Sequence, residues 1–106
     1  MFSINNIQWY IKFVHPNSRY LYRRNGTLTV GMCDSDTKTI YINEKLQGKK
    51  LKKVLSHELT HAAMFSYQMY LSYKQEEVIA DIIATYGKEI VSMTDTLFEK
   101  IRMERL

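Results

Sequence analysis

Two histidines and a glutamate form the most informative pattern in this chain, His57-Glu58-Leu59-Thr60-His61. In a helix, residues four apart lie on one face, so both imidazole rings can reach a single metal ion. Imidazole is a common ligand of zinc, and Glu58 directly follows the first histidine, which places its carboxylate beside the ion. There it can accept a proton from a zinc-activated water molecule. The pattern predicts Zn²⁺ as the cofactor, His57 and His61 as metal ligands, and Glu58 as the catalytic base.

A catalytic zinc site usually has a third protein ligand and one open position. Downstream of the motif, Glu77 and Asp81 are four residues apart and are predicted to share one face of a second helix. We expect Glu77 to be the third ligand, with Glu76 as the alternative, and Asp81 to accept the free N–H of a ligand histidine. The other histidine, His15, precedes a proline and is expected to lie in a surface turn.

Apolar residues around the motif recur with helical periodicity, which predicts a helix that begins at about residue 49. Its apolar positions are Leu51, Val54, Leu55, Leu59, Ala62, Ala63 and Phe65. A second helix is expected from about Gln75 to Tyr86, and Thr94 or Asp95 is expected to cap a third.

The residues before the motif helix predict one more helix and a small sheet. Apolar residues at steps of three and four predict an amphipathic helix over residues 4–14. Asn25-Gly26 is a strong signal for a two-residue hairpin turn, and residues 39–42 alternate like a strand. A short antiparallel sheet is therefore expected at about 20–43, and the expected fold class is α+β.

Length and composition indicate one domain over residues 1–106, since 45% of the residues are hydrophobic and 25% are charged. The single cysteine, Cys33, excludes an intramolecular disulfide and favours a cytoplasmic location. Its expected role is that of a small buried apolar residue. No apolar run is long enough to span a membrane, and the N-terminus lacks the pattern of a signal peptide, so no membrane association is expected.

The net charge of +4 raises the alternative of a nucleic-acid-binding module. The densest basic run is Lys49, Lys50, Lys52 and Lys53. These lysines fall at the start of the predicted motif helix, where the helix dipole does not favour positive charge, and a solvated face is the simpler explanation. The sequence has no recognisable nucleic-acid-binding motif, so nucleic acid is not an expected partner.

The segment VLSHELTHAAMF followed by EEVIADIIATYGKEI is similar to the gluzincin pattern, in which HExxH is followed one helix later by ExxxD. In size and order the chain resembles small metallopeptidases predicted in phages and mobile elements. It is also similar to the ImmA/IrrE-type peptidases, in which a strand-rich segment precedes HExxH. The resemblance covers roughly residues 28–90. It implies a minimal zincin-like fold, with a short sheet, a motif helix and a ligand helix.

The resemblance implies a zinc-dependent metallopeptidase whose partner is a protein or peptide substrate. The strand at 39–43 is expected to pair with an extended substrate. Tyr67, Tyr70 and Tyr73 are candidate donors to the substrate carbonyl, although tyrosines at this spacing more often pack against other side chains. The alternative function is a non-catalytic, zinc-containing protein-binding module on a peptidase-like fold.

Overall fold

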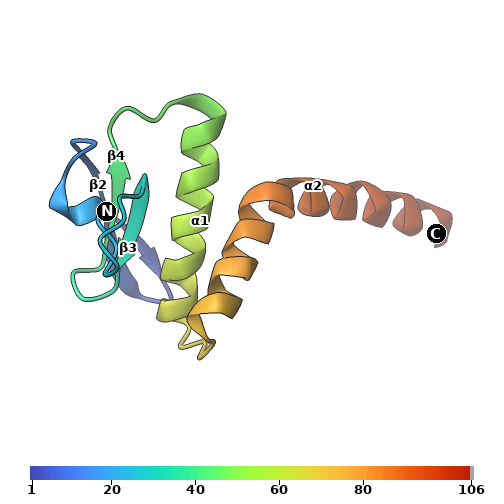
Figure 1. Ribbon diagram of the computed structural model, residues 1–106. Helices are drawn as coiled ribbons and strands as arrows, with labels where there is room; N and C mark the ends of the chain where they lie inside the picture. Colours follow the sequence, from blue (N-terminus) through green and yellow to red (C-terminus); the bar gives the residue numbers. More distant parts are fainter. Residues whose placement is uncertain (106) are drawn as a thin grey trace.

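In the computed structural model, which describes residues 1–105, a small sheet packs against one helix, and a second helix packs against the first (Figure 1). The strands are β1 (Phe2–Ile4), β2 (Ile7–Val14), β3 (Gly31–Asp34) and β4 (Thr39–Asn43), with a 3-10 turn, η1 (Arg19–Leu21), after β2. The helices are α1 (Gly48–Ser66) and α2 (Tyr73–Arg105). The expected α+β class is therefore confirmed.

The predicted N-terminal helix over residues 4–14 is wrong, because this segment forms a β-hairpin. Asn5 and Asn6 have φ angles of 49° and 64°, the left-handed conformation that asparagine tolerates better than most residues. Together they make a two-residue turn in which Ile4 pairs with Ile7. From Ile7 to Val14 the chain is rich in β-branched and aromatic residues, which favour a strand.

The sheet is mixed, with the strand order β1-β2-β4-β3. β2 runs parallel to β4, whereas β3 and β4 form an antiparallel hairpin. The predicted antiparallel sheet at 20–43 is thus only partly found. The chain does reverse at Asn25 and Gly26, but the predicted two-residue turn is wrong. Residues 24–26 form a three-residue loop closed by the hydrogen bond from the backbone N–H of Arg23 to the carbonyl of Thr27, and of Asn25 and Gly26 only Gly26 has a positive φ, 84°. A single bridge between Tyr22 and Leu28 flanks this loop instead of two strands. β4 has a neighbour on both sides, so the expectation that it pairs with a substrate is wrong. The edge strands are β1 and β3, and β3 is the one beside β4.

The core lies between the sheet and α1. Trp9, Ile40, Ile42 and Ala62 form its centre, and none of the four is exposed to solvent. The indole N–H of Trp9 donates a hydrogen bond of 2.8 Å to the hydroxyl of Ser66 at the end of α1. This buried contact fixes the C-terminal end of α1 to the β1–β2 hairpin and so helps to set the position of the motif helix.

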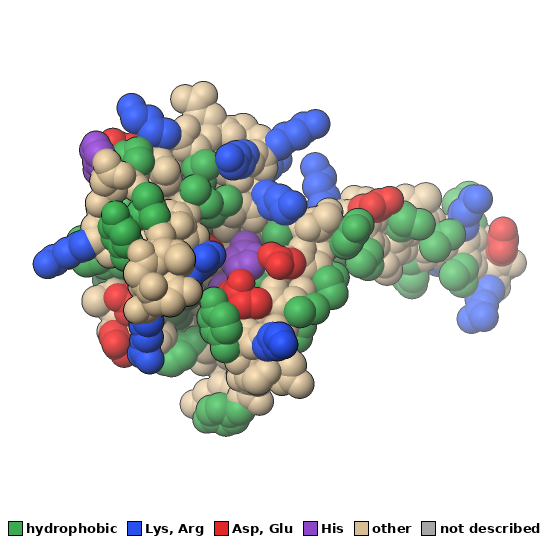
Figure 2. Space-filling model, in the orientation of Figure 1, with side chains coloured by type: hydrophobic (Ala, Val, Ile, Leu, Met, Phe, Trp, Pro, Cys, Tyr) green, Lys and Arg blue, Asp and Glu red, His purple; other side chains and the backbone are tan. Residues whose placement is uncertain are grey.

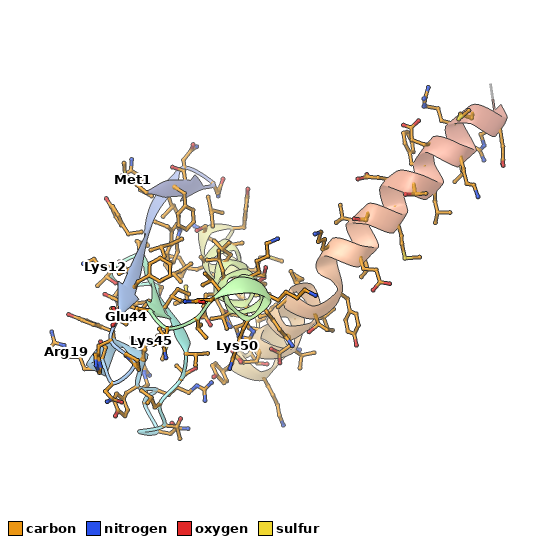
Figure 3. The ribbon with its side chains drawn as sticks, turned by 90° about the horizontal axis from the view of Figure 1, so that it is seen from above. Met1, Lys12, Arg19, Glu44, Lys45 and Lys50 are labelled. Atoms are coloured by element: carbon orange, nitrogen blue, oxygen red, sulfur yellow. The ribbon has the colours of Figure 1, made fainter. Side chains whose placement is uncertain are left out.

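After α1, residues 67–72 reverse the chain, and the first half of α2 packs against α1. Ser72 and Gln75 form a capping box, in which each side chain accepts a hydrogen bond from the backbone N–H of the other. The predicted third helix is wrong, because α2 continues without a break to Arg105. α2 bends midway, and its second half projects away from the body (Figures 1 and 3). None of the helices in residues 1–105 combines the length and the apolar character that crossing a membrane requires.

Candidate metal centre

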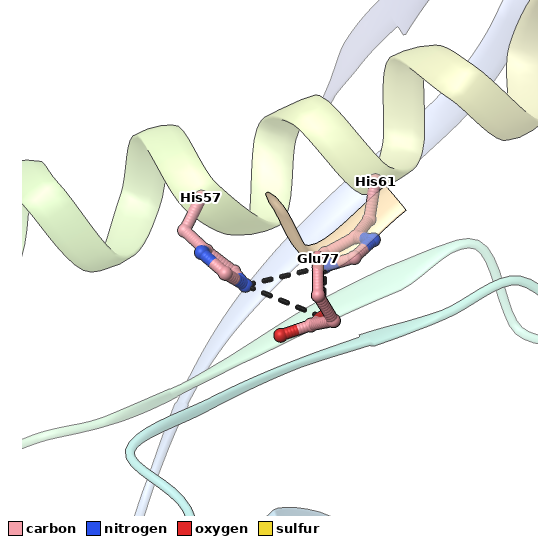
Figure 4. Close-up of side chains that lie close together, drawn as sticks. All are labelled: His57, His61 and Glu77. Atoms are coloured by element: carbon pink, nitrogen blue, oxygen red, sulfur yellow. Dashed lines mark hydrogen bonds and ion pairs between the residues drawn. The ribbon is translucent and has the colours of Figure 1, made fainter. Parts of the chain in front are cut away.

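Three side chains from α1 and α2 converge beside the sheet (Figure 4). The Nε2 atoms of His57 and His61 are 3.2 Å apart. The Oε1 atom of Glu77 lies 2.7 Å from Nε2 of His61 and 3.5 Å from Nε2 of His57. Two atoms bound to one tetrahedral zinc ion at about 2.0–2.1 Å would be roughly 3.4 Å apart, close to two of these separations. The group His57, His61 and Glu77 could therefore hold a metal ion.

The second nitrogen of each imidazole also meets a carboxylate from α2. Asp81 Oδ1 lies 2.9 Å from Nδ1 of His57, and Glu76 Oε1 lies 2.6 Å from Nδ1 of His61. A carboxylate at this position accepts the Nδ1–H and leaves the lone pair of Nε2 free to bind a metal. Glu76, the alternative third ligand, therefore faces the opposite side of His61 from Glu77.

The contact of Glu76 with His61 is one that reasoning from the sequence missed. Glu76 and Glu77 are adjacent, and neighbouring residues on a helix point about 100° apart, so the two were treated as competitors for one position. In the structure His61 lies between their carboxylates and contacts both of them. The sequence does contain a clue to this contact, because two adjacent glutamates can each contact one of the two nitrogens of a single imidazole.

Glu58 lies in α1 beside the two histidines and is 8% exposed. Burial raises the pKa of its carboxyl group, while the neighbouring His57 and His61 act in the opposite direction. Among residues 1–105, the group of potential ligand atoms within 4.8 Å of one another contains His57, His61 and Glu77 but not Glu58. Glu58 thus lines the cleft without joining the three converging side chains.

The edge strand β3 approaches Glu58 closely because it begins with a glycine. A Cβ atom at Gly31 would lie 2.6 Å from Cγ1 of Val54 and 3.2 Å from Oε2 of Glu58. Any other residue at this position would have to displace one of these two side chains. Gly31 therefore lets the backbone of β3 pass directly beside the carboxylate.

The converging side chains open into a cleft of about 1040 Å³. Its walls come from residues 29–33 on the sheet side, the histidine face of α1, and the segment 64–77 with the start of α2. Figure 2 shows the histidines in this hollow, with acidic side chains next to them and apolar side chains at the rim. The cleft is thus polar where the two histidines and the acidic side chains meet.

Arg23 is a second cleft residue that reasoning from the sequence missed. It belongs to the Asn25-Gly26 turn, and its guanidinium donates a hydrogen bond of 3.3 Å to the hydroxyl of Thr29. Arg23 lines the same cleft as Glu58, and its positive charge offsets a small part of the rise that burial causes in the pKa of that carboxyl group. No feature of the sequence pointed to this residue, because the fold alone brings the turn over the cleft.

The candidate tyrosines divide into two groups. Tyr70 and Tyr73 line the cleft and are 90% and 71% exposed, so their hydroxyls are free to meet a ligand. Tyr67 is exposed but is not among the residues that line the cleft. His15 lies in an exposed turn, where its Nδ1 accepts a hydrogen bond from the backbone of Asn17.

Cys33, on β3, also borders the cleft. Burial raises the pKa of its thiol to about 12, and the negative charges of Glu58 and Glu76 add to this effect. The thiol therefore stays protonated at neutral pH, which makes it a poor nucleophile and a poor metal ligand.

Comparison of the sequence with models of known protein families and with curated proteins finds no match. The case for a function therefore rests on the residues of the cleft and their geometry.

Proposed function

We propose that this protein is a zinc-dependent metallopeptidase that hydrolyses peptide bonds in a protein or peptide substrate. The observation that carries the proposal is the convergence of His57, His61 and Glu77 within 4.8 Å, with the carboxylate of Glu58 in the same cleft. Metal binding by itself needs no buried acidic residue beside the ligands, whereas hydrolysis needs a base at that place.

The donor set fits zinc better than the other common metal ions. Two imidazole nitrogens and one carboxylate are a ligand set of catalytic zinc sites, whereas calcium and magnesium prefer oxygen ligands alone. Asp81 and Glu76 orient the two imidazoles through Nδ1, an arrangement that accompanies histidine ligands of zinc. With His57, His61 and Glu77 as its ligands, a four-coordinate zinc ion would keep one position for a water molecule or a substrate oxygen.

In this proposal each residue of the cleft has a defined task. Zinc, when bound, lowers the pKa of water to about 7 and polarises the substrate carbonyl. Glu58 accepts the proton of the attacking water and passes it to the amine that leaves. Among the hydrogen-bond donors that line the cleft, the hydroxyls of Tyr70 and Tyr73 and the guanidinium of Arg23 are our candidates to meet the carbonyl oxygen.

The edge strand β3 is the element best placed to bind an extended peptide. It pairs with β4 on one side, and within residues 1–105 no strand pairs with its other side. Residues Gly31, Met32 and Cys33 of this strand line the cleft. A peptide that adds to the sheet at this edge would be held mainly by its backbone, so its scissile bond would pass Glu58 with little dependence on side chains.

Peptide cleavage by the zinc-loaded protein tests the proposal directly. We expect new peptide termini when it is incubated with a mixture of unfolded proteins and the products are analysed by mass spectrometry. Removal of the metal with a chelator should abolish cleavage, and added zinc should restore it. Cleavage that survives metal removal would contradict the proposal. A protein that binds zinc but yields no new termini would instead be the non-catalytic binding module.

Glu76 provides a test of how the site is held together. Glu76→Gln should lower the affinity for zinc by about 10–100-fold, because the amide cannot replace the carboxylate that orients and polarises His61. The affinity can be measured by competition with a chromophoric chelator. Glu89→Gln, an exposed position on the same helix, is the matched control and should keep the affinity of the wild type. Equal affinities for the two variants would show that Glu76 does not support the site.

A further inference from the structure

The second half of α2 is not packed against the rest of the protein. All residues from 88 to 105 are exposed, and this segment projects away from the sheet and from α1 (Figures 1 and 2). An isolated helix of this length is only marginally stable in water, because most of the stability of protein helices comes from packing one face against a partner. A partner surface that covers one face of this segment would therefore stabilise it.

One face of this segment is apolar. Six apolar side chains recur at helical spacing and are between 48% and 61% exposed. They are Ile90, Val91, Met93, Leu97, Phe98 and Ile101, and we call them the C-terminal apolar face. The opposite side of the helix carries Lys88, Asp95, Glu99 and Arg102. Such a contiguous apolar surface with a polar reverse side is typical of a helix that packs against another helix.

We propose that the C-terminal apolar face binds the same face of a second copy of this chain. Ile90, Thr94, Leu97 and Ile101 are spaced by four, three and four residues, which is the spacing of the core positions in a coiled coil. Val91, Phe98 and Met93 flank this row and widen the surface. Two such helices can therefore bury a continuous seam between them.

The charges of the segment favour a second copy over the other occupants of an amphipathic helix. Residues 88–105 carry four basic and four acidic side chains, whereas the whole chain has a net charge of +4. A neutral helix of mixed charges does not repel its own copy. It also lacks the basic polar face with which amphipathic helices bind anionic membranes, and the basic surface that nucleic acid requires.

The area of the C-terminal apolar face is sufficient for a dimer. Six side chains of this size that are about half exposed present roughly 600 Å² per copy, or roughly 1,200 Å² for two, which is the lower limit for specific protein interfaces. Ile83 and Tyr86 continue the same face toward the body and are 45% and 54% exposed. The interface can therefore extend along α2 beyond the six residues.

The mass in solution tests this inference. Sedimentation equilibrium at micromolar concentrations should give twice the chain mass of 12.6 kDa for the wild type. Leu97→Asp should weaken the dimer at least tenfold, because it places a charge in the seam. Ser92→Asp, which adds the same charge to the polar side of α2, should remain dimeric.

Zinc content and the circular dichroism spectrum show whether each variant is folded. Ile101→Asp is a second variant that places a charge in the seam. A wild type that is monomeric at 100 µM would overturn the inference, as would a dimer that Leu97→Asp and Ile101→Asp leave unchanged. Binding of the wild type to anionic vesicles, lost in Leu97→Asp, would identify a membrane as the occupant and would also overturn it. None of these outcomes depends on peptidase activity.

Discussion

Replacement of Glu58 by glutamine is expected to reduce peptide cleavage by at least about 100-fold while the metal stays bound. The amide has nearly the shape of the carboxylate but cannot take a proton from water, and general-base catalysis typically contributes about 10²–10⁴-fold. Glu58 is not one of the three converging side chains, so the variant keeps all three of the proposed metal ligands. Zinc content by elemental analysis and the cleavage rate are measured on the same preparation.

The control for Glu58→Gln is Glu44→Gln, which makes the same chemical change at an exposed position after β4. It should keep both zinc and activity. Loss of zinc from Glu58→Gln would mean that Glu58 is a ligand. An unchanged cleavage rate would remove the catalytic role of Glu58 and with it the proposed mechanism.

Replacement of Glu77 by alanine is expected to abolish the stabilisation of the fold by zinc. A metal that binds only the folded state contributes about 2.7 kcal/mol when its concentration is 100 times the dissociation constant. For a domain of this size that corresponds to a rise in Tm of roughly 10–20 °C. Glu77→Ala leaves two histidines, which rarely retain zinc, so its Tm should not change when zinc is added.

Thermal unfolding with and without zinc measures this effect. Glu44→Ala removes an exposed carboxylate far along the chain from α2 and should show the full shift of the wild type. A shift of the same size in Glu77→Ala would place the metal elsewhere or assign its third ligand to another residue.

The helix that carries the motif was predictable because its signals are local. The apolar residues of α1 repeat every three or four positions, and the histidines lie on the face that a four-residue step selects. The start predicted near residue 49 agrees with the observed start at Gly48. The same local geometry placed Glu77 and Asp81 on one face of α2, and the structure brings both to the histidines.

The N-terminal hairpin was not predicted because its apolar residues also fit a helix. Ile4, Ile7, Ile11 and Val14 are spaced by three and four residues. Their strand conformation depends on the Asn5-Asn6 turn and on pairing of β2 with β4, a contact between segments far apart in the sequence. Tertiary contacts of this kind override local periodicity.

The end of α2 was misjudged for a related reason. Thr94 and Asp95 resemble helix caps, but within α2 the hydroxyl of Thr94 donates to the carbonyl of Ile90, four residues earlier, at 2.8 Å. This hydrogen bond gives the hydroxyl of Thr94 a partner inside the helix, so a threonine at this position does not indicate that a new helix begins. The position of Arg23 over the cleft, by contrast, depends on the whole arrangement of the sheet.

The most direct test of the central claim is a crystal structure of the zinc-loaded protein with anomalous diffraction recorded at the zinc edge. We predict one strong anomalous peak, about 2.0–2.2 Å from Nε2 of His57, Nε2 of His61 and the carboxylate of Glu77. The carboxylates of Asp81 and Glu76 should remain hydrogen-bonded to the two Nδ1 atoms. A peak at any other group of side chains, or the absence of a peak at these three in zinc-grown crystals, would contradict the account.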